Sequence, residues 1–302
     1  MRQTVLILGG SGKIGSRATD AFWNAGWEVR QYDRTSGDMV AAARGVDVIV
    51  NGLNPPAYHD WERTIPEITS QVIAAAQASG ATVIIPGNVY NYGDQPGVLG
   101  ETTPQNALTK KGRVRIEMEE SYRAAGVPTI VLRAGNFIDP AGNGDIMSML
   151  VMRNIAKGTL TSASDPGTLQ AYAYVPDWAR AAVQLAEKRS VLAPFEDVPF
   201  PGHAFTINTL QAAVQAKMGR QIKISRFPWA IMTVLAPFWE LAREMREMRY
   251  LYEMPHQISA AKFKRLLPGF IATPLDEVML AGLPADIHPN KVVNPSRQPI
   301  VT

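Results

Sequence analysis

Hydrophobic residues along this chain occur in two patterns, short continuous runs and longer stretches with helical spacing. The helical pattern is clearest over residues 61–79, where Ile65, Ile68, Val72 and Ala76 share one stripe. The continuous runs are typical of buried parallel strands and cover residues 4–8, 46–50, 81–85 and 128–133, with a further strand predicted at 27–32. This alternation predicts an α/β fold, a Rossmann-type doubly wound parallel sheet of six or seven strands.

The spacing of these segments indicates how the chain is divided. Residues 33–45 are too few for a helix–strand–helix excursion, so one edge strand of the sheet is expected to be missing. The regular alternation ends near residue 140. We therefore expect a first domain at residues 1–140 and a smaller C-terminal α/β substrate lobe at residues 141–302. The segments near 172–187 and 204–218 are expected to return to the first domain, the second of them with a last strand at 204–207.

A glycine-rich turn joins the first predicted strand to the first helix. Its glycines, three residues apart, allow a tight turn, close approach of the backbone to a pyrophosphate, and close packing of helix on strand. The unpaired N–H groups at the start of the helix favour an anion. We therefore expect a dinucleotide to bind at Gly9, Ser11, Gly12, Lys13, Ile14 and Gly15.

The residues after the second strand bear on which dinucleotide binds. Asp33 is placed to accept hydrogen bonds from the adenosine ribose hydroxyls, which favours NAD. Arg34 and Lys13 are instead suited to a 2′-phosphate, which favours NADP. The sequence leaves both cofactors open, with a lean towards NAD.

Polar and small residues follow the other strands at the edge where ligands bind in open α/β sheets. Leu53 and Asn54 follow the strand at 46–50, Pro86 follows the strand at 81–85, and Asn136 follows the strand at 128–133. We expect all four to contact the cofactor.

Composition excludes several classes of function. The net charge is +3 with basic residues dispersed, so nucleic-acid binding is not expected. The chain has no cysteine, and its four histidines lack metal-ligand spacing, so neither thiolate chemistry nor a metal site is expected. The longest apolar run, residues 229–239, is broken by Pro237 and too short to cross a bilayer. These features predict a soluble, cytoplasmic protein.

These landmarks together resemble the extended short-chain dehydrogenase/reductase family, which includes nucleotide-sugar epimerases and dehydratases. The resemblance rests on the glycine turn, Asp33, and five segments in the family's order: GNVYNYG at 87–93, LRAGNFIDP at 132–140, YVPDWARA at 174–181, FTIN at 205–208 and FKRLLPGFIATPLDEVM at 263–279. It implies an NAD(P)-dependent oxidoreductase acting on a carbonyl or hydroxyl of a small or nucleotide-sugar-like substrate. It also implies a homodimer formed through the helices at 61–79 and 104–125.

The chain departs from the family at the catalytic residues. Family members use a tyrosine and a lysine four residues later on one helix, after a serine or threonine that here falls on Pro86. One register of the helix puts Thr109 and Arg113 at the missing positions, and the other puts Lys111 and Arg115 there. Lys111 and Arg115 share one helix face with Met118 and Tyr122, so we expect this pair to face the cofactor. Thr109 and Arg113 lie on the opposite side, which we expect to face solvent.

Four residues are therefore candidates for catalysis, each with an alternative role. Lys111 is placed to act as acid or base, or only to bind the cofactor's phosphate or ribose. Arg115 supplies charge and position but no proton. Tyr90, like Tyr92, is an alternative proton donor or a packing residue, and Asn88 holds a substrate oxygen or forms a turn.

Two functions remain open from the sequence. The first is the enzyme described above with atypical catalytic residues, favoured by the nearly complete substrate lobe. The second is a catalytically inactive NAD(P)-binding sensor or regulatory protein, favoured by the missing Tyr/Lys pair. On the helical stretch 229–252, Arg243 and Glu247 lie four residues apart and are expected to pair on a solvated face.

Overall fold

The computed structural model of the chain describes residues 2–283, so residues 284–302 of the expected lobe lie outside the described part. Its strands are β1 (Thr4–Leu8), β2 (Glu28–Gln31), β3 (Val48–Asn51), β4 (Thr82–Gly87), β5 (Gly97–Leu99), β6 (Thr129–Arg133), β7 (Asn136–Ile138), β8 (Thr159–Ser162), β9 (Gln170–Tyr174), β10 (Phe195–Pro199), β11 (His203–Phe205), β12 (Lys223–Arg226) and β13 (His256–Ile258). Its helices are α1 (Lys13–Asn24), α2 (Met39–Ala42), α3 (Trp61–Ser79), α4 (Lys110–Ala124), α5 (Val175–Glu187), α6 (Ile207–Met218), α7 (Trp229–Leu235), α8 (Glu240–Glu247), α9 (Arg249–Glu253), α10 (Ala261–Leu266) and α11 (Leu275–Leu280).

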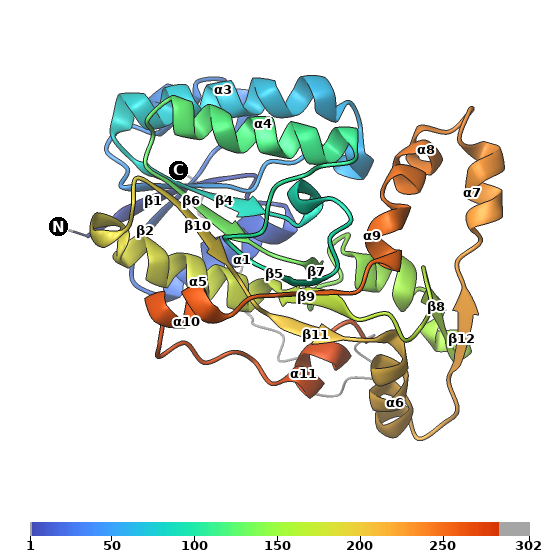
Figure 1. Cartoon of the computed structure of the whole chain (residues 1–302). Coiled ribbons are helices and arrows are strands. Elements are labelled where there is room, and N and C mark those ends of the chain that lie inside the picture. The colour runs from blue at the N-terminus through green and yellow to red at the C-terminus, as the bar shows by residue number, and fades with distance from the viewer. Residues whose placement is uncertain (1, 284–302) are drawn as a thin grey trace.

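A six-stranded parallel sheet in the order β10-β6-β4-β3-β1-β2 forms the centre of the molecule (Figure 1). Side chains of each strand alternate between two cores. Val5 and Ile7 of β1 pack with α1 and α5, whereas Leu6 and Leu8 pack with α3 and α4. The predicted doubly wound α/β fold is confirmed. The sheet ends at β2, as the short connection at 33–45 predicts.

The C-terminal half differs from the prediction in two places. The sixth strand is β10, whereas the sequence pattern predicts a last strand near residue 204. Glu196 and Asp197 interrupt β10, which lies at the sheet edge, so no continuous apolar run marks it. β11 pairs instead with β9 in a small sheet, and Leu210 and Val214 of α6 pack with Val278 of α11. The segment 204–218 therefore belongs to the lobe, while α5, within 172–187, packs under the central sheet.

α3 and α4 lie side by side over one face of the sheet (Figure 1). Pairing of two copies through these helices stays a prediction. Among residues 2–283, no helix is both long enough and apolar enough to span a membrane.

One buried arginine fixes the loops at the carboxyl edge of the sheet. Arg133, the last residue of β6, is fully buried, and its guanidinium binds Glu119 of α4 at 2.7 Å and Asp197 of β10 at 2.6 Å. It also donates a hydrogen bond of 2.8 Å to the carbonyl oxygen of Asn88. These contacts tie β6, α4 and β10 to the loop after β4, which carries Asn88 and Tyr90.

Replacing this arginine is expected to destabilise the fold strongly. Arg133→Met leaves two carboxylates without their buried partner, so we expect a loss of about 3–5 kcal/mol in the free energy of unfolding. Arg123→Met is the matched control, because its exposed ion pair with Glu120 is worth less than about 1 kcal/mol. Urea unfolding followed by circular dichroism measures both, and equal losses would contradict the prediction.

Candidate active site

The turn between β1 and α1 has the geometry of an anion-binding cradle. Gly9 has a φ of +75°, and a side chain at Gly15 would collide with the carbonyl oxygen of Gly9. α1 begins after Gly12, and no side chain among the described residues caps its first N–H groups. These groups, with the helix dipole, are available to a negatively charged ligand. The turn therefore fits the pyrophosphate of a dinucleotide.

A loop from the lobe lies against this turn. Lys13 Nζ donates a hydrogen bond of 2.7 Å to the carbonyl oxygen of Gly144, and Asn143 Nδ2 lies 3.4 Å from the carbonyl oxygen of Ser11. Burial lowers the pKa of Lys13, and the nearby carboxylates of Asp145 and Asp139 oppose this effect. The side chain of Ile14 is part of the core under the sheet, so only its backbone can meet a ligand.

Asp33 and Arg34 lie together just after β2. The Asp33 carboxylate accepts hydrogen bonds from the hydroxyl of Thr35 at 2.7 Å and from its backbone N–H at 2.8 Å. These bonds lower the pKa of Asp33, which caps the short turn Arg34–Ser36. Both Asp33 and Arg34 are exposed. The structure thus holds a carboxylate and a guanidinium at the expected place, and their roles in cofactor choice stay predictions.

The loop after β3 contacts α4. Asn54 Oδ1 accepts a hydrogen bond of 2.8 Å from the guanidinium of Arg115, which also lies over the ring of Trp61. Arg115 is buried, and its Nε has no partner among the described residues. Leu53 lies against the glycine turn, within contact distance of a side chain placed at Gly9. Two predicted site residues, Asn54 and Arg115, are therefore in direct contact.

The remaining predicted residues lie at the ends of β4 and β6. Pro86 is half-buried within β4, and Asn136 begins β7 and lines a small cavity of about 20 Å³ in the lobe. Asn88 Oδ1 accepts a hydrogen bond of 2.9 Å from the backbone N–H of Tyr90. Asparagine makes this bond to the backbone two residues on where it forms a turn. The hydroxyl of Tyr92 is buried and donates to the carbonyl oxygen of Gly100. Tyr92 is therefore a packing residue rather than a proton donor.

α4 has the register that turns Lys111 and Arg115 inward. Its buried face includes Lys111, Val114, Arg115, Met118 and Tyr122. Thr109, expected on the solvent side, is instead the buried N-cap, and its hydroxyl accepts the N–H of Gly112 at 3.1 Å. The capping bond starts the helix at Lys110, later than the expected residue 104.

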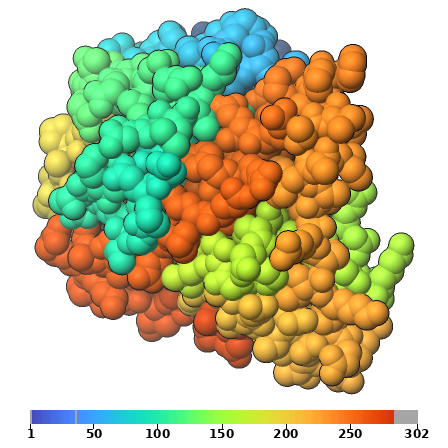
Figure 2. Space-filling view, turned by 45° about the vertical axis from the view of Figure 1, so that its right-hand side comes forward, coloured from blue at the N-terminus to red at the C-terminus, as the bar shows by residue number. Residues whose placement is uncertain are grey.

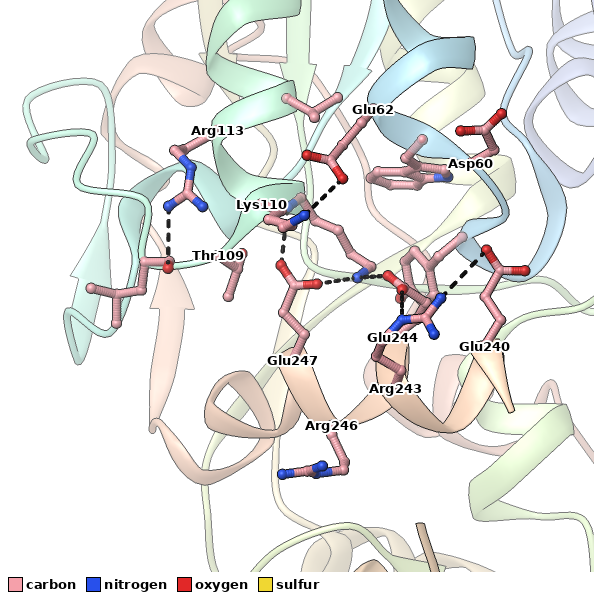
Figure 3. Close-up of a pocket in the computed structure, with 15 residues that line it drawn as sticks. Asp60, Glu62, Thr109, Lys110, Arg113, Glu240, Arg243, Glu244, Arg246 and Glu247 are labelled. Carbon is pink, nitrogen blue, oxygen red and sulfur yellow. Dashed lines mark hydrogen bonds and ion pairs between the residues drawn. The ribbon is translucent and has the colours of Figure 1, made fainter. Parts of the chain in front are cut away.

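A pocket of about 710 Å³ lies between the starts of α3 and α4 and the facing helix α8 (Figure 3). In the space-filling view, the orange segment with α8 and α9 packs against the teal and green segment that leads into α4 (Figure 2). The charged residues that line the pocket are Asp60, Glu62, Lys110, Lys111, Arg113, Glu240, Arg243, Glu244, Arg246 and Glu247. Its aromatic wall is formed by Tyr58 and Trp61.

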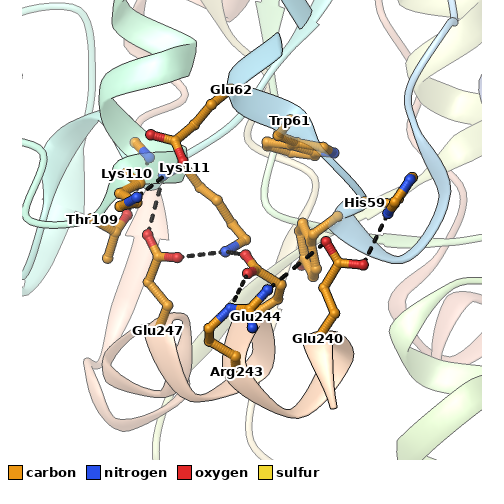
Figure 4. A network of polar contacts seen from close by, with 12 residues as sticks. His59, Trp61, Glu62, Thr109, Lys110, Lys111, Glu240, Arg243, Glu244 and Glu247 are labelled. Carbon is orange, nitrogen blue, oxygen red and sulfur yellow. Dashed lines mark hydrogen bonds and ion pairs between the residues drawn. The ribbon is translucent and has the colours of Figure 1, made fainter. Parts of the chain in front are cut away.

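Lys111 is the centre of an ion-pair network in this pocket (Figure 4). Its Nζ binds Glu244 and, at 2.6 Å, Glu247, and its side chain is only 3% exposed. Glu247 also accepts the backbone N–H of Lys111 at 3.2 Å, at the helix end where an anion is favoured. The expected pairing of Arg243 with Glu247 is therefore wrong: Arg243 contacts Glu240 and Glu244 instead. The two carboxylates form charge-assisted hydrogen bonds with the ammonium.

Tyrosine hydroxyls gather beside this network. The hydroxyl of Tyr58 lies 3.3 Å from that of Tyr90, and the ammonium of Lys111 lies over the ring of Tyr58. Burial raises the pKa of Tyr58 well above its ordinary value and that of Tyr250 to about 12. No motif in the sequence marks Tyr58, Glu244 or Glu247. The one signal in the sequence for Tyr58 is its position in the loop that follows a buried strand.

The loop that carries Tyr58 has a strained backbone. Ala57, Tyr58 and Asp60 have φ values of +51°, +62° and +47°, in the left-handed region that favours glycine. Such residues cost about 1–3 kcal/mol each and cluster at functional sites. No group of described His, Asp or Glu residues is arranged to hold a metal ion.

The glycine turn, the parallel sheet and the covering lobe define a dinucleotide-binding α/β enzyme fold. The family model described as "NAD dependent epimerase/dehydratase family" matches residues 5–198, more than half of the chain. The chain therefore belongs to this family of NAD-dependent enzymes. The family is the one indicated by the sequence motifs, and NAD is its cofactor, as expected.

Solved structures with this fold cover almost the whole chain. UDP-glucuronic acid 4-epimerase from Bacillus cereus, in complex with UDP-glucuronic acid and NAD, is 13% identical with a TM-score of 0.72, covering 93% of this chain and 98% of that one. The enzyme WbmH from Bordetella bronchiseptica, in complex with NAD+, is 16% identical with a TM-score of 0.69, covering 93% and 97%. A UDP-galactose 4-epimerase is 18% identical with a TM-score of 0.66, covering 93% and 97%. At these identities the likeness is one of fold. No curated protein sequence matches the chain.

The two adjacent lysines of α4 provide a test of the ion-pair network. Lys111→Met leaves Glu244 and Glu247 facing each other without a cation, so we expect a loss of about 3 kcal/mol in stability and faster hydrogen exchange across residues 240–253. Lys110→Met removes only an exposed pair with Glu62 and is expected to change neither quantity measurably. Exchange mass spectrometry measures the local effect. Unchanged exchange in Lys111→Met would mean that the network does not hold α8.

Proposed function

We propose that the protein binds NAD on the turn Gly9–Gly15 and acts on a carbonyl or hydroxyl carbon of a nucleotide-sugar-like substrate, as an epimerase or dehydratase. The proposal rests chiefly on one observation, the glycine turn with its uncapped helix start on the same sheet edge as Tyr90. NAD, when bound, supplies hydride transfer. The protein then has to bind both molecules, exclude water and move one proton.

Cofactor binding is assigned to groups that lie along the carboxyl edge of the sheet. The backbone N–H groups of the turn, contributed by Gly9, Ser11, Gly12, Lys13, Ile14 and Gly15, hold the pyrophosphate. Asp33 binds the adenosine ribose, and Arg34 lies beside it. Leu53, Asn54, Pro86 and Asn136 form the walls, and Arg115 supplies positive charge, because Glu244 and Glu247 neutralise the charge of Lys111.

Proton transfer is assigned to Tyr90 among the four candidates. Arg115 stays protonated, the amide of Asn88 does not titrate, and the ammonium of Lys111 is held between two carboxylates. Tyr90 remains, on the loop after β4. Arg115 interacts electrostatically with Tyr90, so the assigned proton donor has a positive charge near it.

The pocket supports a polar substrate of moderate size. A volume of about 710 Å³ lies within the usual range for small-molecule sites. Its carboxylates accept hydrogen bonds from sugar hydroxyls, and its aromatic wall offers an apolar face. A solved structure of the same fold carries UDP-glucuronic acid. We therefore infer a nucleotide sugar as the substrate class.

A sensor is the second candidate function. The Lys111–Glu244–Glu247 network favours it, because the residue at the family's tyrosine position is engaged within the protein itself. A sensor binds the cofactor and turns over no substrate.

Cofactor binding and turnover can be measured separately. Titration calorimetry is expected to give binding of NAD+ that is tighter than binding of NADP+. Incubation with NAD+ and a panel of UDP-hexoses and UDP-hexuronates, followed by NMR of the products, is expected to detect an epimer or a dehydrated sugar. Absence of binding to either dinucleotide would refute both functions, and binding without turnover would favour the sensor.

Tyr90→Phe tests the assigned proton donor. Loss of a positioned acid or base lowers kcat by about 10²–10⁴-fold, and we expect this loss with unchanged affinity for NAD+. Tyr92→Phe is the matched control, since the hydroxyl of Tyr92 serves only a buried backbone contact. A Tyr90→Phe protein that turns over substrate at the wild-type rate would exclude Tyr90 as the donor.

A further inference from the structure

We infer that Tyr58 is a positioning residue for Tyr90, holding the phenolic oxygen of Tyr90 where the proton is transferred. The inference rests on the proposed function, in which Tyr90 moves the proton. It adds a residue that neither the glycine motif nor the Tyr-x-x-x-Lys pattern of the family would select.

The geometry of the two phenols supports this role. Their hydroxyl oxygens lie 3.3 Å apart, joining the loop after β3 to the loop after β4. Burial, and then the charge and hydrogen bond of Tyr90, raise the pKa of Tyr58 well above its ordinary value. Tyr252 also raises the pKa of Tyr58, whereas the charge of Arg115 lowers it. The ammonium of Lys111 lies over the ring of Tyr58. Tyr58 therefore keeps its proton at neutral pH, and the two hydroxyls share one hydrogen bond.

The position of Tyr58 is fixed from both sides. Its ring packs edge to face on Trp61 at a centroid distance of 5.2 Å, and Trp61 Nε1 donates to the carbonyl oxygen of Pro55 at 3.4 Å. The next residue, His59, binds Glu240 of α8 at 2.9 Å (Figure 4). The left-handed backbone at Ala57 and Tyr58 is held in place by these contacts.

The ring and the hydroxyl of Tyr58 have separable roles. A phenylalanine would keep both the packing on Trp61 and the contact with the Lys111 ammonium. Only the hydrogen bond to Tyr90 requires the hydroxyl. A buried hydroxyl kept at a strained position is thus best explained by its effect on Tyr90.

A substrate-independent test uses protein labelled with ¹³C at the ζ carbon of tyrosine. The signal of Tyr58, assigned by its loss in Tyr58→Phe, is expected to titrate well above the ordinary value of about 10. In Tyr90→Phe it should titrate at lower pH, because the hydrogen bond and charge of Tyr90 are gone. In Tyr92→Phe it should not move. An identical Tyr58 titration in Tyr90→Phe and wild type would overturn the inference.

The kinetic test uses a substrate found in the UDP-sugar panel. Tyr58→Phe is expected to lower kcat about tenfold, as loss of one hydrogen bond to the reacting group would, with KM and NAD+ affinity unchanged. A Tyr58→Phe protein with wild-type kcat, or with a raised KM alone, would overturn the positioning role. Absence of all turnover would contradict the proposed function, and the NMR titration would still decide whether the two phenols are coupled.

Discussion

The close approach of α1 to β1 is the constraint on which the rest of this structure depends. Gly15 packs its backbone against the carbonyl of Gly9, a contact that any side chain would prevent. Gly52, in the loop after β3, likewise lies against Leu8 and Gly15. Because these glycines let three backbone segments meet, the uncapped start of α1 lies at the sheet edge where the other loops also end. A ligand with two phosphate groups fits this edge, because its oxygens accept hydrogen bonds from the unpaired N–H groups at the start of α1.

The buried face of α4 carries two cationic side chains. The ammonium of Lys111 and the guanidinium of Arg115 lie one helical turn apart on it. Two cations on one buried face repel each other, so each needs partners of its own. Glu244 and Glu247 neutralise Lys111. Asn54 and the ring of Trp61 contact Arg115. The same carboxylates attach α8 to the start of α4, so the charge of Lys111 also helps to hold α8 in place.

The sequence predicted what depends on local patterns. Continuous apolar runs correctly predict four strands of the sheet, and helical periodicity correctly predicts that Lys111 and Arg115 face inward. Prediction from the sequence failed where contacts between residues far apart in the chain determine the structure. β10 carries Glu196 and Asp197 and lies at the sheet edge, where half-exposed strands lack a continuous apolar run. Glu247 pairs with Lys111, 136 residues away, instead of Arg243 on its own helix. Tyr58 has no motif, because its importance comes from a backbone conformation and a partner in another loop.

The strained loop and the ion-pair network depend on each other physically. His59, between the left-handed residues Tyr58 and Asp60, binds Glu240 of α8, and the ring of Tyr58 lies under the ammonium that Glu244 and Glu247 hold. Contacts with α8 thus offset part of the backbone strain, about 1–3 kcal/mol per left-handed residue. A movement of α8 away from α4 would release Lys111 and loosen Tyr58 together. The helix that closes the pocket therefore also holds the loop that carries Tyr58.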